Sequence, residues 1–143
     1  MRLWHKDLIP VLPRQQLLGQ WRECCALARK IAVDVDPNHP LVNRVTEYPI
    51  EHFWAYTRLV HDEMMARGYG CDWYTFGKWC DGMGSFPEKL DVNYDDIFYD
   101  WHNNRYFWQC FYNLEEKYDC ETFTDEEWEK ICDEAAYHEY PSE

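Results

Sequence analysis

Apolar side chains recur at helical spacing in two long stretches of the first half of the chain. The first stretch, residues 13–33, has four such positions: Leu17, Trp21, Cys24 and Ala28. The second stretch, residues 49–67, has another four: Phe53, Tyr56, Val60 and Met64. Intervals of three and four residues place each set on one face of a helix. We therefore expect two long helices, each burying its apolar face, with Gly68 ending the second.

Weaker patterns predict the remaining elements. Pro10 and Pro13 restrict the backbone near the start of the chain, and Thr124 followed by three acidic residues is typical of a helix start. Aromatic residues are dense over 94–117, where short strands are the alternative to a helix. The other expected elements are an extended arm over 1–12, a loop over 34–40, a short helix over 72–81, a turn over 82–90 and a helix over 94–117.

These elements predict an all-α fold, a compact single domain over residues 1–143 with an extended N-terminal arm. A chain of 143 residues is long enough for one core and too short for two ordinary ones. It has no apolar run long enough to span a membrane, and its start lacks the apolar stretch of a secretory signal. We therefore expect no membrane partner and a cytoplasmic location.

The acidic charge of the chain lies in its second half. The formal net charge is −13, which by itself argues against a nucleic-acid partner. Residues 1–69, however, carry nine basic and eight acidic side chains, whereas residues 70–143 carry five and nineteen. We infer two electrostatically different parts, of which the second either docks a partner or is only a solvated surface.

Seven cysteines are present, without a CxxC pair and without zinc-ligand spacing. Reduced thiols that pack as small apolar groups are the simplest interpretation. A helix-borne metal site is a weaker hypothesis, since no HExxH spacing occurs among its candidates. Those candidates are His52, Tyr56, His61, Asp62 and Glu63. We expect no metal.

The stretch Arg14–Cys25, RQQLLGQWRECC, is the best candidate for chemistry. Gly19 lies one helical turn before both Arg22 and Glu23, and an interior glycine destabilises a helix by about 1 kcal/mol relative to alanine. The missing side chain would leave room for a ligand to approach the pair. The alternative is a close helix–helix contact at Gly19, with Arg22 and Glu23 solvated.

This stretch resembles the first helix of the pyrimidine-dimer DNA glycosylases, the endonuclease V family. A family motif of the form Gln-x-Leu-x-x-x-aromatic-Arg-Glu is matched by Gln15, Leu17, Trp21, Arg22 and Glu23. The segment LVHDEMMARGY is similar to the end of the family's second helix, and an arginine follows the terminal residue in both. The resemblance covers about residues 1–69 and leaves residues 70–143 unmatched.

The resemblance implies an endonuclease V-like fold and a DNA repair glycosylase with AP-lyase activity. In the family an N-terminal α-amine attacks C1′ of the damaged nucleotide, and a Schiff base precedes strand cleavage. Glu23 matches the catalytic carboxylate, and Met1 is the expected nucleophile because Arg2 would block removal of the initiator methionine. The expected DNA-binding residues are Arg2, Arg14, Gln15, Gln16, Arg22 and Arg29. Damaged DNA is the implied partner, and no cofactor is implied.

The chain departs from the family in ways that bear on substrate choice. Met1 replaces the family's threonine, Gln16 replaces a histidine, and Ala26 replaces an arginine for which Arg29 is a partial substitute. A second function class therefore stays open. In that alternative the chain is a non-catalytic protein- or nucleic-acid-binding module on the same fold, and its acidic half docks a basic partner.

Overall fold

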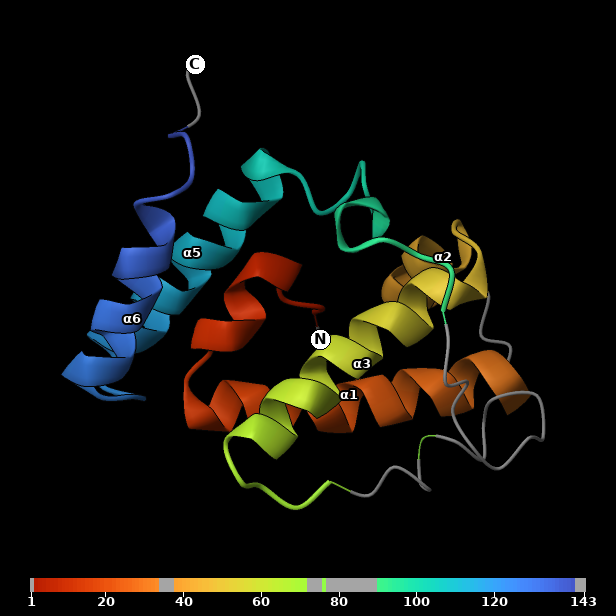
Figure 1. Ribbon diagram of the computed structural model, residues 1–143, viewed down its shortest axis with the longest axis horizontal. Coiled ribbons are helices and arrows are strands. Elements are labelled where there is room, and N and C mark those ends of the chain that lie inside the picture. Colours follow the sequence, from red (N-terminus) through yellow and green to blue (C-terminus); the bar gives the residue numbers. More distant parts are fainter. Residues whose placement is uncertain (1, 34–37, 72–75, 77–89, 141–143) are drawn as a thin grey trace.

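The computed structural model describes residues 2–33, 38–71, 76 and 90–140. Its regular elements, in chain order, are η1 (Lys6–Val11), α1 (Arg14–Val33), α2 (Pro40–Thr46), α3 (Ile50–Ala66), η2 (Tyr94–Asp96), α5 (Asn104–Asp119) and α6 (Asp125–Ala135). All are α- or 3-10 helices, and these described ranges contain no strand, so the all-α prediction is confirmed. Figure 1 shows α1 against α3 on one side, α5 beside α6 on the other, and η1 between the two pairs.

The two long helices form where the apolar periodicity predicts them. All four predicted core positions of α1 are buried, and so are the four of α3. Gly68 adopts a φ of 80°, a left-handed conformation that glycine tolerates, and its N–H donates to the Met65 carbonyl at 3.0 Å. Gly68 therefore ends α3 as predicted.

One cluster of buried apolar side chains extends over both halves of the sequence. Its largest fully buried members are aromatic and come from α3, α5 and the segments between them: Phe53, Tyr56, Phe76, Phe98 and Phe107. Their rings contact one another at ordinary separations, such as 5.8 Å between the centroids of Phe53 and Phe76. The aromatic residues of the acidic half are therefore in part core residues.

The extended arm is shorter than predicted. Residues 2–5 are extended, but residues 6–11 form the 3-10 helix η1, so the prediction for that part is wrong. The His5 side chain caps η1 by accepting the Asp7 N–H at 3.1 Å. Pro10 lies inside η1, where its fixed φ suits a short helical turn. A histidine cap is not among the usual sequence signals for a helix start, which is why the pattern missed it.

The helix α2 was also not predicted. His39 caps it by accepting the Val42 N–H at 3.2 Å, and Pro40 occupies its first turn. In the sequence this proline marked the end of a loop, whereas it is also the residue best suited to begin a helix. The seven residues of α2 are too few to display a periodicity of their own.

The stretch predicted as one helix over 94–117 is helical in two separate pieces. η2 and α5 occupy the range predicted as a helix over 94–117, and Asn103 caps α5 by accepting the Tyr106 N–H at 2.9 Å. The Thr124 prediction is confirmed, because its hydroxyl and the Glu127 carboxylate form a reciprocal capping box. The short helix predicted over 72–81 and the turn up to residue 89 lie outside the described residues, apart from Phe76.

None of the described helices is long and apolar enough to cross a membrane. The six cysteines in the described ranges are free thiols, and Cys24 is fully buried among apolar side chains. Burial raises the pKa of the Cys24 thiol far above its ordinary value. This residue is therefore a protonated packing group, as the sequence predicts.

Two buried histidines join the N-terminal arm to the start of α5. The Lys6 N–H donates to His102 Nδ1 at 3.0 Å, and His5 Nε2 donates to the His102 carbonyl at 3.0 Å. Each ring uses Nδ1 as an acceptor, which requires the neutral form. Burial lowers the pKa of His5 to about 4 and that of His102 well below its ordinary value.

We expect the free energy of unfolding to fall as the pH drops from about 6.5 to about 4. In this window His5 takes up a proton in the unfolded chain but not in the folded one, so acid favours unfolding by up to about 3 kcal/mol. His5→Asn keeps an acceptor for the Asp7 N–H and removes the titrating ring. Denaturant unfolding followed at several pH values should give this variant a shallower pH dependence, and an unchanged slope would contradict the assignment.

Candidate functional site

Side chains from three helices bond the backbone of the N-terminal arm. Gln20 on α1 donates through Nε2 to the Arg2 carbonyl at 3.1 Å and accepts the Trp4 N–H through Oε1 at 2.7 Å. The Tyr56 hydroxyl on α3 donates to the Trp4 carbonyl at 2.5 Å. From α5, the Tyr106 hydroxyl donates to the Leu3 carbonyl at 2.6 Å. Side chains thus form most of the hydrogen bonds to the backbone N–H and carbonyl groups of this extended segment, which has no strand partner in the described chain.

This bonding places Arg2 next to Glu23. The Arg2 backbone N–H donates to Glu23 Oε2 at 3.1 Å, across 21 residues of sequence. The Arg2 guanidinium lies 5.6 Å from the centre of the Trp4 ring and contacts Cys110 Sγ at 3.8 Å. Glu23 is half-buried, so its carboxylate reaches both the arm and solvent. The structure therefore brings together Arg2 and Glu23, two of the predicted site residues.

A polar pocket of about 330 Å³ opens at this carboxylate. Its lining residues come from the arm, α1 and α5: Arg2, Trp4, Glu23, Asn113 and Lys117. Two cations and one carboxylate give the lining a net positive charge within a strongly acidic chain. A pocket with this charge suits a sugar flanked by phosphates, because the cations meet the phosphates and the carboxylate meets a developing positive charge.

The wall contributed by α5 is one continuous face of that helix. Tyr106, Cys110, Asn113 and Lys117 follow one another at intervals of four, three and four residues, which is the spacing of a single helical face. The first two contact the arm and the last two line the pocket. Burial raises the pKa of both Tyr106 and Cys110, so both stay protonated beside the arm. The acidic half thus supplies a side of the site.

Sequence reasoning missed the α5 residues and Gln20. Lys117 offers one signal, as one of only five basic residues after position 69, but nothing in the sequence connects it with Glu23. Gln20 lies next to the motif and is 1% exposed, an unusual burial for a glutamine that only the folded chain reveals.

The other predicted site residues divide between two faces of α1. Gln15, Arg22 and Arg29 are exposed and recur every seven residues, so they share one outward face beside the pocket. Gln16 shares the face of Glu23 and is half-buried, with a buried Oε1 that has no hydrogen-bond partner within the described residues. Beyond the backbone of its own helix, a methyl group at Gly19 would meet only the Arg22 guanidinium, at 3.9 Å. The described chain therefore makes no close helix–helix contact at Gly19.

Arg14 lies apart from this arrangement. Nine residues separate it from Glu23, which corresponds to about 14 Å along the axis and to the opposite side of the helix. Its backbone N–H donates to Glu127 Oε2 at 2.8 Å, and its guanidinium lies 5.7 Å from the centre of the Tyr69 ring. Arg14 thus joins the start of α1 to α6. Met1, the expected nucleophile, lies outside the described residues.

The candidate metal ligands do not converge. Across residues 2–33, 38–71, 76 and 90–140, no group of three or more His, Cys, Asp or Glu side chains could hold a metal ion. His52 Nδ1 accepts the Phe98 N–H at 3.1 Å, and His61 Nδ1 lies 3.1 Å from Asp62 Oδ1. These histidines have structural partners on the protein.

We expect Gln20→Leu to release the arm. The substitution leaves the Trp4 N–H and the Arg2 carbonyl without their buried partners, so the free energy of unfolding should fall by about 1–3 kcal/mol. Amide hydrogen exchange at Trp4 should accelerate. Gln15→Leu changes an exposed glutamine on the same helix and should alter neither quantity. Equal exchange at Trp4 in all three proteins would show that Gln20 does not hold the arm.

Comparison with known proteins supports the resemblance seen in the motif. A profile of the family described as pyrimidine dimer DNA glycosylase matches residues 1–73, which include η1, α1, α2, α3 and both Arg2 and Glu23. No curated protein and no solved structure matches the chain. The matched segment covers half of the sequence and contains the Arg2–Glu23 contact. The chain belongs to the pyrimidine dimer DNA glycosylase family.

Proposed function

We propose that the protein is a DNA repair glycosylase with AP-lyase activity that acts through the α-amine of Met1. The observation that carries this proposal is the 3.1 Å contact between the Arg2 N–H and Glu23 Oε2, since Arg2 is bonded directly to Met1. A second is the polar, cation-lined pocket at the same carboxylate. Family membership supplies the substrate class, damaged pyrimidines in DNA.

The proposed reaction begins with attack of the amine nitrogen on C1′ of the damaged nucleotide. The N–C1′ bond forms, the glycosidic bond breaks, and the base leaves with its electron pair. The amine then loses a proton, the C1′–O4′ bond opens, and the resulting iminium acidifies C2′. Loss of the C2′ proton breaks the C3′–O bond and releases the 3′ phosphate. An α-amine, with an ordinary pKa of about 8, is partly neutral near pH 7 and so can act as the nucleophile.

Glu23 has two roles in this scheme. Its carboxylate stabilises the cationic sugar and the iminium electrostatically, and it accepts and returns the protons of the amine and of C2′. Arg2 and Lys117 flank the same pocket and are positioned to meet the phosphates on either side of the sugar. Arg22 and Arg29, on the neighbouring exposed face of α1, extend the cationic surface along the strand. The damaged nucleotide must be distorted or extruded to reach the pocket.

Borohydride trapping tests the nucleophile directly. Reduction of the Schiff base should link the protein covalently to duplexes that carry a cyclobutane pyrimidine dimer or an abasic site. Peptide mapping should find the link on the N-terminal peptide. Absence of a link with both substrates would contradict the lyase mechanism. A link on the peptide containing Lys117 would instead identify the Lys117 amine, which lines the pocket, as the nucleophile.

Glu23→Gln should lower base release by at least about 100-fold, because the amide can neither stabilise a cation nor carry a proton. Glu116→Gln is the matched control, since Glu116 is an exposed carboxylate on α5 outside the pocket lining. Single-turnover base release from a dimer-containing duplex measures both. Full base release by Glu23→Gln, or by protein with a blocked α-amine, would contradict the roles proposed for these groups. Absence of base release from the unmodified protein would favour the non-catalytic binding-module alternative.

Lys117→Gln should weaken binding to abasic duplex DNA uniformly across sequences. Loss of one phosphate contact should reduce the slope of log K against log salt concentration by about 1. Lys130→Gln removes the same charge from an exposed position on α6 and should leave the slope unchanged. Fluorescence anisotropy at several salt concentrations measures both slopes, and equal slopes for the two variants would place Lys117 outside the DNA contact.

A further inference from the structure

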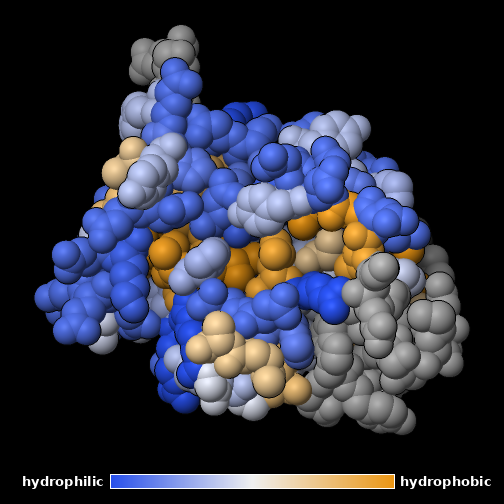
Figure 2. Space-filling view, in the orientation of Figure 1, coloured by the Kyte–Doolittle hydropathy of each residue, from blue (hydrophilic) through white to orange (hydrophobic). Residues whose placement is uncertain are grey.

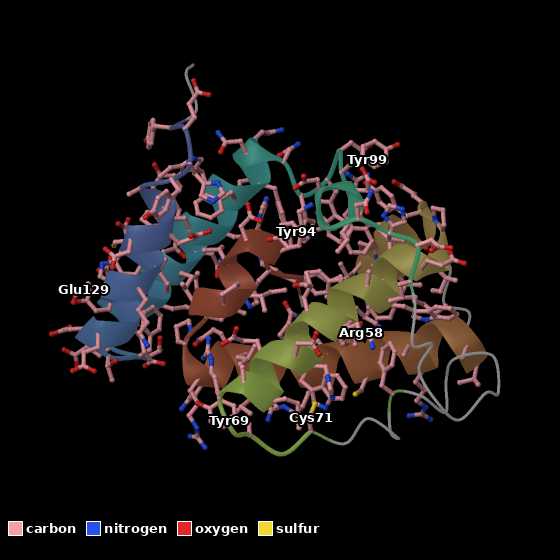
Figure 3. The ribbon with its side chains drawn as sticks, viewed as in Figure 1. Arg58, Tyr69, Cys71, Tyr94, Tyr99 and Glu129 are labelled. Atoms are coloured by element: carbon pink, nitrogen blue, oxygen red, sulfur yellow. The ribbon has the colours of Figure 1, made fainter. Side chains whose placement is uncertain are left out.

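An apolar groove follows α3 and shares no lining residue with the pocket at Glu23. Two adjoining hollows of about 460 Å³ and about 310 Å³ form it, and Leu59, Asp62 and Tyr94 line both. We call this combined surface the α3 groove. Figure 3 shows Tyr94 beside η1 and Arg58 on α3. Figure 2 shows apolar surface across the middle of this face, with polar residues above and below it.

The length and lining of the α3 groove suit a helical segment. Along α3 the groove extends from Ala55 to Ala66, which is about 16 Å or three helical turns. The opposite wall is also largely apolar and comes from η1 and the segment around η2: Ile9, Pro10, Val92 and Ile97. An amphipathic helix that lays one apolar face into such a groove is a recurrent mode of peptide recognition.

The rim of the α3 groove is acidic. Asp62, Glu63 and Asp91 line it, and the exposed Asp95 and Asp96 act electrostatically on Lys6 at one end. Glu63 is already paired with Arg67, whose Nε lies 2.7 Å from Glu63 Oε2, so Asp62 and Asp91 are the lining carboxylates that a partner's cations would meet. Of the two cations in the lining, Lys6 is already engaged, because its ammonium donates to the Tyr94 carbonyl at 2.6 Å and to the Ile97 carbonyl at 3.3 Å. A segment entering the groove therefore meets apolar walls edged by an excess of carboxylates.

We propose that the α3 groove binds a basic amphipathic helix of a partner protein. Apolar side chains at helical spacing would fill the groove, and Lys or Arg residues on the flanks would meet the carboxylates of the rim. The carboxylates gathered at the groove would speed the encounter with a cationic partner, most strongly at low ionic strength. Because the groove and the Glu23 pocket share no residue, such a partner could bind while the pocket holds DNA.

A synthetic helical peptide tests this proposal on the full chain. The probe has Leu at three- and four-residue intervals and Lys elsewhere, and a second peptide has the same composition in shuffled order. The amphipathic peptide should bind with micromolar affinity and shift the amide resonances of α3, η1 and residues 90–97. The shuffled peptide should bind at least about tenfold more weakly, a difference of 1.4 kcal/mol or more.

Two variants on α3 distinguish binding of the peptide in the groove from general attraction between opposite charges. Leu59→Lys places a cation in the groove, whereas Met65→Lys places the same charge on an exposed position outside the lining. Leu59→Lys should weaken peptide binding at least about tenfold, and Met65→Lys should change it much less. Equal weakening by both variants, or resonance shifts elsewhere, would overturn the proposal. Sedimentation that shows a dimer which Leu59→Lys dissociates would also overturn the proposal, because the groove would then be occupied by a second copy of this chain.

Discussion

The candidate site depends on one constraint, the hydrogen bonding of the backbone of the N-terminal arm. An extended segment exposes an N–H and a carbonyl at each residue, and burial makes unbonded groups costly. Here Gln20, Tyr56 and Tyr106 bond the arm from three different helices, and His102 bonds the backbone where η1 begins. These directional bonds fix the path of the arm, and the Arg2 N–H consequently meets Glu23. The site is thus a result of how the arm is held.

The same arrangement is compatible with the proposed DNA-binding site on an acidic chain. The cations that matter are few and local: Arg2 and Lys117 in the pocket, with Arg22 and Arg29 on the adjoining face of α1. Many carboxylates of the second half lie on the exposed sides of α5 and α6, and Glu129 points outward at the edge of the molecule. Because salt screens separated surface charges over roughly 10 Å, local geometry rather than net charge governs attraction at the pocket.

Long periodic elements could be predicted from the sequence, and short capped elements could not. The core faces of α1 and α3 and the start of α6 at Thr124 follow from spacing and cap chemistry visible in the sequence. η1 and α2 depend on histidine side chains as caps, a rare choice, and have too few residues for a period. Glu23 and Arg2 were found through a family motif, whereas Lys117 lies 94 positions beyond Glu23 and joins it only through folding.

In the proposed mechanism, the boundary of the family match separates the catalytic residues from part of the wall that the substrate would contact. Residues 1–73 contain Arg2 and Glu23, but one wall of their pocket belongs to α5, beyond that segment. The face of α5 that holds Leu3 and Arg2 through Tyr106 and Cys110 continues without a break to the pocket wall. A change at the end of this face can therefore alter the shape and charge that a lesion meets, while the bonds that position Arg2 against Glu23 stay intact. Under the proposed mechanism, the chemistry and the choice of lesion can thus diverge separately on this fold.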